Sequence, residues 1–502
     1  NRDGIGAVVE VYSDKRFSTR MAKEPTGVRI GLGAEEDSAL DGIFIRWPQG
    51  IRQSERGEGL AENGRATVVQ SEGLMASCPF LYVRGENGWT FRTDAIAIAP
   101  LAEWLPPGAT PHRDPEEYVY LPGSELAVHD GRVEIAITEE LRETTYLDRA
   151  ELVWVDYPGH AEVIADESTR QGAYDPLAFW LFEKERRFAP VDSVRVSADE
   201  EDHLERVLTM DREYSRAYST DVPTQWAGWV HPHQTAFQLD RPAQLMLLTG
   251  RIAWYDSTVV FALAQQGRSW SPLELGHAAE SGEWETLVPD LGVPAGMDRT
   301  MVIHRDRPFD PGSYRLLGHH RFSWDRIAFV ERADRVEIGG ASRGRLGFPT
   351  GEVRYGRVPA ATARLEFHGY SGTVGDLALH DQTYRYETAA PSDRFPRARG
   401  VATRYGDVHE LVTAHDDHVV VMVAGDRTVL SFEVPEPAAG VGRAYFLRLT
   451  GWCKEGSYHN VTGDRIEPLP YREMTEYPPR DPRPQDVAYR KYLRTYQTRI
   501  VR

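Results

Sequence analysis

His231 and His233 are separated by one residue, and this spacing suits a metal ion better than that of any other histidine pair in the sequence. Residues i and i+2 of a β-strand point to one face, so both imidazoles could reach the same ion. A sandwich metal site of this kind would also place an acid four or five positions later. Phe237 and Gln238 stand there instead. We therefore expect loop histidines rather than a metal centre.

Calcium is a second cation to consider, because Asp416 and Asp417 stand together. A calcium loop normally supplies alternating oxygen ligands, and no D-x-D-x-D-G run occurs in the chain. We predict no cofactor, and calcium remains an alternative that no motif supports.

Aromatic and polar side chains cluster after two similar runs, Leu248-Thr-Gly250 and Leu449-Thr-Gly451. At the rim of a β-sandwich, an exposed ring can stack on a sugar while nearby Asp, Asn or Lys side chains bind its hydroxyls. Burial of the tryptophans in the core is the structural alternative, and a protein interface is a third. The candidate ligand contacts are Trp254, Tyr255, Asp256, Trp452, Lys454, Tyr458 and Asn460.

Signatures of catalysis are weak in this chain. Gly369-Tyr-Ser-Gly372 has its second glycine one place too early for a nucleophile elbow, and Gly4-Ile-Gly6 lacks the third glycine of a dinucleotide loop. Acids are numerous, but their spacing in sequence cannot show two carboxylates facing each other. Whether the protein is an enzyme stays open, and the failed motifs favour a non-catalytic role. The acids considered are Glu139, Glu140, Glu143, Asp148 and Asp256.

Composition limits the partners. The formal charge is −18, from 58 basic and 76 acidic residues, which disfavours a sequence-independent nucleic-acid binder. No apolar run is long enough for a transmembrane helix. Cys78 and Cys453 are too far apart for a zinc cluster of the CxxC type, and either one disulfide or two thiols would fit. A strong preference for arginine over lysine points to a bacterium of high GC content.

Short alternating runs bounded by glycine and proline predict strands through most of the chain. In the run Glu151–Asp156, apolar residues occupy both faces, so we expect this strand to be buried on both sides. The first sixty residues contain three such runs, at 7–12, 28–32 and 42–47.

Three motifs of this opening segment resemble the module shared by cartilage acidic protein and the bacterial UnbV proteins, called ASPIC/UnbV. They are NRDGIGA from Asn1, IGLG from Ile30 and IRWPQG from Ile45. The segment Arg20–Thr26 is shorter than its counterpart in the family. Further runs resemble the long C-terminal extension of large bacterial members. They are Ser77–Val83, Asp114–Tyr118, Ile137–Leu141, Thr145–Asp148, Thr403–Asp407, Leu449–Trp452 and Val461–Tyr471.

This resemblance implies a bacterial protein that acts outside the cytoplasm: extracellular, at the cell surface or in the periplasm. Family members normally carry a propeller of FG-GAP repeats before the module, and those repeats do not occur in this sequence. Residue 1 is Asn, so we expect a processed product or a piece of a longer chain. The expected partners are other protein chains, such as an FG-GAP propeller or further copies of this chain, and a glycan.

We predict an all-β protein, since helical spacing is rare. A small N-terminal module and a β domain would precede two tandem, jelly-roll-like sandwich units that the paired Leu-Thr-Gly runs mark as related. The tail has an aromatic stripe at helical spacing over Tyr489–Tyr496.

The leading function is a non-catalytic binding or assembly protein, or an accessory subunit of a surface complex. The rival is a carbohydrate-active enzyme or a carbohydrate-binding protein. The predicted boundaries are 1–64 for the ASPIC/UnbV-like module, 65–197 for the β domain, 198–219 for a helical linker, 220–335 for sandwich unit 1, 336–360 for a connector, 361–480 for sandwich unit 2, and 481–502 for a tail with a short helix.

Overall fold

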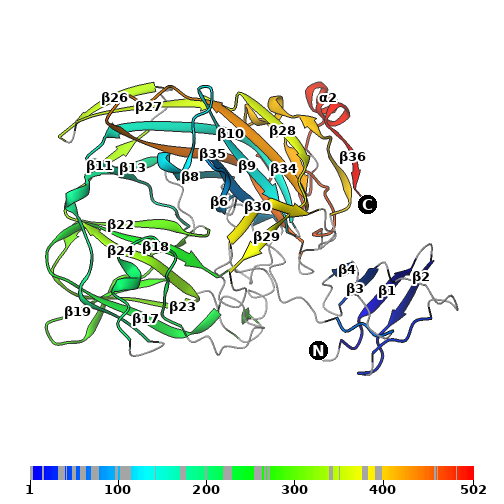
Figure 1. Ribbon diagram of the computed structural model, residues 1–502, viewed down its shortest axis with the longest axis horizontal. Coiled ribbons are helices and arrows are strands. Elements are labelled where there is room, and N and C mark those ends of the chain that lie inside the picture. Colours follow the sequence, from blue (N-terminus) through cyan, green and yellow to red (C-terminus); the bar gives the residue numbers. More distant parts are fainter. Residues whose placement is uncertain are drawn as a thin grey trace.

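The computed structural model is built almost entirely of antiparallel strands (Figure 1). It describes residues 4–13, 16–25, 27–31, 40, 42–47, 52–56, 64–68, 79–96, 100–101, 115–141, 143–169, 177–197, 201–218, 229–253, 263–264, 267, 272–294, 296–338, 343–349, 351–375, 383–390, 398–456, 460, 462–481 and 483–501. The prediction of an all-β protein is confirmed.

The N-terminal strands form a four-stranded sheet that lies apart from the rest of the chain in Figure 1. Its order is β2-β1-β3-β4, and a small core of Ala7, Ala22, Ile43 and Ile45 packs on one side. The strands are β1 (Val8–Ser13), β2 (Arg16–Met21), β3 (Gly42–Arg46) and β4 (Arg52–Arg56). The prediction of a strand at 28–32 was wrong, since residues 27–31 have no strand pairing and Leu32 lies outside the described residues.

Two stretches distant in sequence build a first sandwich, which we call the split sandwich. One layer, the β35 sheet, has seven strands, and the other, the β9 sheet, has six. The β35 sheet contains β26 (Arg343–Phe348), β27 (Gly351–Pro359), β10 (Glu143–Pro158), β35 (Val441–Glu455) and β7 (Pro100–Leu101) in this order, with β33 (Val420–Val423) on β10 and β8 (Glu116–Pro122) on β35. The β9 sheet runs β32 (Gly406–Asp407), β28 (Thr362–Phe367), β34 (Asp426–Glu433), β9 (Arg132–Glu139), β5 (Phe80–Gly85) and β6 (Gly88–Asp94).

Residues between β10 and β26 form a second sandwich, the inserted sandwich. Each of its sheets has five strands. The β24 sheet runs β14 (Arg187–Phe188), β24 (Phe322–Val330), β18 (Ala243–Ile252) and β22 (Arg299–Phe309), with β16 (Ser215–Arg216) on β24. The β23 sheet runs β15 (Val191–Val196), β17 (Trp229–Leu239), β23 (Gly312–His320), β19 (Glu274–Ala278) and β20 (Trp284–Val288).

A three-stranded sheet joins the two sandwiches. It consists of β11 (Ala161–Ile164), β13 (Ala178–Glu183) and β25 (Asp334–Glu337). Successive side chains of a strand point to opposite faces, so Phe179 and Leu181 pack on the β35 sheet while Trp180 and Phe182 pack on the β24 sheet. The layers therefore follow the order β9 sheet, β35 sheet, β13 sheet, β24 sheet and β23 sheet.

Smaller elements complete the fold. The hairpin of β29 (Tyr370–Val374) and β30 (Thr383–Ala390) packs its tyrosines against the outer side of the β9 sheet. The remaining strands are β12 (Ser168–Thr169) with β21 (Val293–Pro294), and β31 (Gly400–Thr403) with β36 (Gln497–Val501). The helices are the 3-10 turns η1 (Gly123–Glu125), η2 (Lys184–Arg186), η3 (Glu205–Val207) and η5 (His409–Val412), and the α-helix α2 (Val487–Thr495).

The strand expected to be buried on both faces is buried in this way. It belongs to β10, where Leu152 and Trp154 enter the core between the two sheets of the split sandwich. Val153 and Val155 enter the core shared with the β13 sheet.

The sheets do not follow the predicted domain boundaries. Strands from 65–197 and from 361–480, which we had assigned to separate units, pair with each other in both sheets of the split sandwich. The inserted sandwich corresponds to the predicted unit 220–335 with β14, β15 and β16 added. Alternation within a strand records its buried faces but carries no information about its partner, so the boundaries could not be read from it.

The predicted helices have different outcomes. In the linker 198–219, the described residues contain only η3, whose Val207 is buried, and the strand β16. In the tail, α2 is present, capped by the Asp486 side chain, which accepts a hydrogen bond from the Tyr489 N–H at 2.8 Å. Its Tyr489 and Tyr492 pack into the core of the split sandwich.

The paired Leu-Thr-Gly runs occupy equivalent places in the two sandwiches, within the inner strands β18 and β35. Opposite each run, the partner strand has a one-residue bulge: Asp325 faces the first and Asp148 the second. Both buried carboxylates accept two backbone N–H bonds from a neighbouring loop, Asp325 from 211 and 212 and Asp148 from 416 and 417. This repeated detail supports the interpretation that the two sandwiches are related.

Candidate functional site

Three of the seven predicted rim residues are buried in the interior rather than exposed on a rim. Trp452 is 3% exposed and packs against Tyr146, and Lys454 and Asn460 are 0% and 5% exposed. β35 is a central strand covered on both faces, so the residues on either side of it enter the interior. Trp254, Tyr255, Asp256 and Tyr458 lie outside the described residues.

The buried Lys454 amine hydrogen-bonds within the protein rather than facing a ligand. Its Nζ donates to the Ile466 carbonyl and to the Tyr477 hydroxyl, both at 2.9 Å. Burial lowers the pKa of this amine to about 7, because charge is poorly solvated there. Asn460 bridges two backbone carbonyls, those of Leu101 and Glu455.

The two histidines do not form a pair. A bulge between Trp229 and His233 turns the strand, so His231 is exposed while His233 is 6% exposed. The His233 Nε2 lies 2.6 Å from the His320 carbonyl oxygen and donates to it, and burial lowers the pKa of the ring to about 4. The two rings therefore do not face one site, and the expectation of loop histidines was wrong, because both residues belong to β17.

Two groups of the described residues have the composition of a cation site: Asp148, His415 and Asp417, and Glu139, Glu143 and Cys453. In both groups, donors of the protein already hydrogen-bond to several of the carboxylates. In the first, the Asp148 carboxylate accepts the backbone bonds described above, and Asp417 accepts from the Arg472 N–H at 2.8 Å. In the second, Thr145 donates to Glu139 at 2.6 Å and the Cys453 thiol lies 2.5 Å from the Glu143 carboxylate. Cys78, the other cysteine, lies outside the described residues.

The acids considered for catalysis are interior groups. Glu139, Glu140, Glu143 and Asp148 are at most 7% exposed. Burial raises the pKa of Glu139 to about 8 and that of Asp148 to about 7. Asp256 lies outside the described residues.

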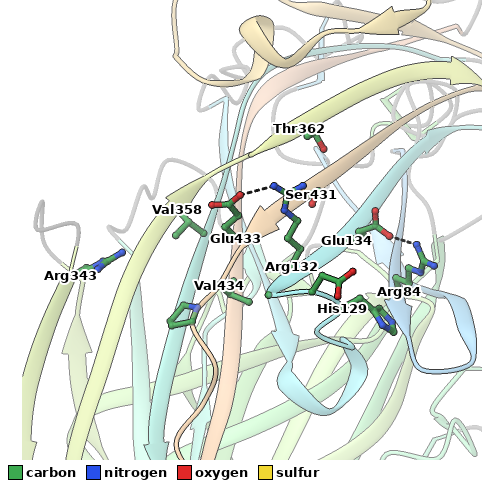
Figure 2. Close-up of a pocket in the computed structure, with 13 residues that line it drawn as sticks. Arg84, His129, Arg132, Glu134, Arg343, Val358, Thr362, Ser431, Glu433 and Val434 are labelled. Carbon is green, nitrogen blue, oxygen red and sulfur yellow. Dashed lines mark hydrogen bonds and ion pairs between the residues drawn. The ribbon is translucent and has the colours of Figure 1, made fainter.

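A groove of about 850 Å³ opens on the split sandwich (Figure 2). Its floor includes outward-pointing residues of the β9 sheet, and residues of the turn 129–131 and of the hairpin β26–β27 complete the lining. The lining residues are Arg84, His129, Asp130, Gly131, Arg132, Glu134, Arg343, Val358, Thr362, Ser431, Glu433, Val434 and Pro435.

Alternation along the strands explains why this floor is polar. In β9, Val133 and Ile135 point into the core, so Arg132 and Glu134 point outward. The hairpin turn that leads into β9 needs left-handed backbone, and Asp130 and Gly131 supply it with φ of 51° and 74°.

The outward residues form a row across five strands. Strand register places Thr362 beside Ser431 and Ser431 beside Glu134. Glu134 forms an ion pair with Arg84, and Arg84 stands beside Trp89 in the adjoining strand. A hydroxyl pair, a carboxylate, a guanidinium and an indole thus succeed each other across the sheet.

A second ion pair, between Arg132 and Glu433 at 2.7 Å, lies next to this row, and Figure 2 shows both pairs in the groove. The side chains of both pairs are between 30% and 67% exposed, so their charged atoms are available to a ligand. The lining contains three arginines against two glutamates and one aspartate, 3 − 3 = 0, so with neutral histidine the groove carries no net charge.

An aromatic cluster borders the row where it ends at Trp89. The indole lies over the Tyr386 ring of β30, with centroids 5.1 Å apart and an interplanar angle of 32°. The backbone N–H of Trp89 donates to the Glu387 carboxylate at 3.2 Å, which fixes the hairpin beside the groove. Sequence reasoning missed the groove, because the row combines residues from five strands that are separated in the chain.

Comparisons with known proteins add little here. No family model matches the chain, and no curated relative was found. Discoidin II of Dictyostelium discoideum aligns with a TM-score of 0.18 at 10% identity, over 52% of this chain and 94% of that one. The mycobacterial arabinofuranosyltransferase AftD aligns with a TM-score of 0.13 at 9% identity, over 89% of this chain but only 30% of that one. Similarities this low carry no inference about this chain, and the ASPIC/UnbV assignment stays a prediction.

Among the described residues, no helix combines the length and the apolar character that crossing a membrane requires.

Proposed function

We propose that this protein is a non-catalytic, extracytoplasmic bacterial protein that binds a neutral carbohydrate in the groove of the split sandwich. The observation that carries the proposal is the charge balance of the groove, whose lining contains three arginines and three carboxylates. A phosphate, a nucleic acid or a polycation would favour a lining of one sign.

Sugar hydroxyls each donate and accept hydrogen bonds, so they are suited to a surface that offers both roles side by side. The Arg84–Glu134 and Arg132–Glu433 pairs supply donor and acceptor atoms at the same place. Ser431 and Thr362 add hydroxyls, and Trp89 adds a partly exposed ring beside the row. The volume of about 850 Å³ is in the range of a small-molecule site and would hold a short oligosaccharide.

The assembly and surface roles expected from the ASPIC/UnbV resemblance are compatible with this proposal. Binding of a wall or capsule polysaccharide would hold the protein, and any chain attached to it, at the cell surface. The FG-GAP propeller partner remains a prediction of the same kind.

The proposal is tested by screening the full chain against neutral oligosaccharides and measuring the affinity of the best ligand by calorimetry. In Glu134→Ala, we expect the affinity to fall about tenfold or more, because a hydrogen bond to a charged group contributes about 1.5–3 kcal/mol. The variant should fold normally, since Glu134 is 30% exposed.

Glu337→Ala is the matched control, because it removes the carboxylate of another exposed Arg–Glu pair, with Arg335 on β25, outside the groove. It should bind like the wild type. Absence of any neutral ligand, or equal binding by both variants, would contradict the proposal. Cleavage of the bound glycan by the wild type would overturn its non-catalytic part.

A further inference from the structure

The inserted sandwich repeats the strand order of the split sandwich. The order β28-β34-β9-β5-β6 in the β9 sheet matches β15-β17-β23-β19-β20 in the β23 sheet. The order β27-β10-β35-β8 matches β14-β24-β18-β22, with β33 on β10 as β16 is on β24. The two copies differ in where the chain starts. The inserted copy runs from β14 to β24, whereas the split copy starts at β5, the counterpart of β19, and ends at β35, the counterpart of β18.

This correspondence extends to the tryptophan at the end of the groove row. Trp89 is the second residue of β6 and follows Gly88 directly, and Trp284 is the first residue of β20 and follows Gly282 with one residue, Glu283, between them. Both turn glycines have left-handed backbone, with φ of 112° at Gly88 and 84° at Gly282. Trp284 therefore occupies on the β23 sheet the place that Trp89 occupies on the β9 sheet.

A polar row leads away from Trp284 as well. Trp284 stands beside Ala278, and Gln238 and Ser313 are register partners on the two inner strands. The Ser313 hydroxyl donates to the Gln238 amide oxygen at 2.6 Å, and both side chains are partly exposed.

Arg315 brings a guanidinium to this tryptophan. The Arg315 side chain passes over β19 at Gly276, and a Cβ atom added to Gly276 would lie only 3.1 Å from the Arg315 Nε. Beyond this glycine, the guanidinium stacks on the Trp284 ring, with its carbon 4.8 Å from the ring centroid. Thr286 and Glu274 form a hydrogen bond of 2.9 Å on the same two strands. The face thus offers a ring, a cation, an acid, an amide and hydroxyls, the same kinds of group as the groove.

We propose that the outer face of the β23 sheet is a second carbohydrate-binding face, centred on Trp284, Arg315, Gln238 and Ser313. The ligand class rests on the function proposed for the groove, whereas the position of the face rests on the repeated fold. The β9 and β23 sheets are the two outermost layers of the stack, so the two faces point away from each other. One chain therefore binds two glycan strands and cross-links them.

The test uses the full chain with a short neutral oligosaccharide, for stoichiometry, and its parent polysaccharide, for cross-linking by light scattering. The wild type should bind two oligosaccharides per chain and cross-link the polysaccharide. Trp284→Ala and Glu134→Ala should each bind one and no longer cross-link, and the double variant should bind none. Trp284→Tyr, which retains a ring, should recover at least half of the cross-linking.

Phe17→Ala is the control, because this exposed aromatic lies on the N-terminal sheet, away from both faces, at 68% exposure. It should behave as the wild type. A single site that only Glu134→Ala removes would overturn this inference and leave the proposed function intact. A single site that only Trp284→Ala removes would overturn the proposed function instead. Absence of binding to any neutral saccharide would overturn both.

Discussion

Glu139 is a carboxyl group whose protonation is coupled to folding. It is 0% exposed, and its oxygens accept from Thr145 Oγ1 and from the Leu141 N–H. Burial raises its pKa from 4.5 to about 8. Between these values the folded chain holds a proton that the unfolded chain releases. The stability that this group contributes is therefore fully present below pH 4.5. It falls by about 1.4 kcal/mol per pH unit between pH 4.5 and about 8, and is lost above that pH.

Glu139→Gln should remove this dependence. The amide keeps the size and can serve both neighbours, accepting from Leu141 and donating to Thr145. We expect the free energy of unfolding to exceed that of the wild type at pH 8 and to match it near pH 5, as measured by urea titration. Burial also raises the pKa values of the neighbouring Glu143 and Asp426. The Glu139 carboxylate adds to the rise at Glu143, so the difference between the two proteins includes the loss of this repulsion. Parallel curves for the two proteins would refute the assignment.

At the scale of the elements, the Leu-Thr-Gly runs are packing devices. A Cβ at Gly250 would lie 2.2 Å from the Ser323 carbonyl oxygen, and one at Gly451 would lie 2.5 Å from that of Tyr146. Both contacts are with backbone of the bulged partner strand, so neither can be relieved by a side-chain rotation. Only glycine allows the central strand to approach its partner this closely.

Gly250→Ala and Gly451→Ala should each lower the free energy of unfolding by on the order of 3 kcal/mol, since backbone must shift to relieve the overlap. Gly347→Ala in β26 is the control, because nothing lies within 4 Å of its added Cβ. Its stability should stay within about 0.5 kcal/mol of the wild type. Equal effects at the three positions would show that the close approach does not matter.

At the scale of the whole molecule, Arg299 joins the two sandwiches. It belongs to β22 of the inserted sandwich and is 1% exposed. Its guanidinium reaches Glu167 at 2.7 Å and, in the split sandwich, Glu117 at 2.9 Å and the Asp94 carbonyl oxygen at 2.6 Å. Loss of the cation would leave two buried carboxylates without their charge partner.

Arg299→Met should therefore cost about 3–5 kcal/mol and separate the thermal unfolding of the two sandwiches into two transitions in calorimetry. Adding Glu117→Gln and Glu167→Gln to this variant should recover part of the loss, because the uncompensated charges are then absent. If the single variant unfolds as the wild type does, Arg299 does not couple the sandwiches.

Much of the local structure of this chain could be predicted from its sequence. Alternation predicted β10 with both faces buried, and helical spacing of the tail tyrosines predicted the segment that α2 occupies. These signals are local, because a strand or a helix repeats its burial pattern within a few residues. The similarity of the two Leu-Thr-Gly runs could also be recognised from the sequence, since each run keeps the glycine that its close strand contact requires.

Which strands are neighbours became known only from the folded molecule. The tertiary structure placed Trp452 and Lys454 in the interior, because β35 is covered on both faces. It assembled the groove from Arg84, Glu134 and Ser431, which lie far apart in the sequence. Pairing between distant strands is set by the sum of many weak contacts over the whole sheet, and no single segment encodes that sum.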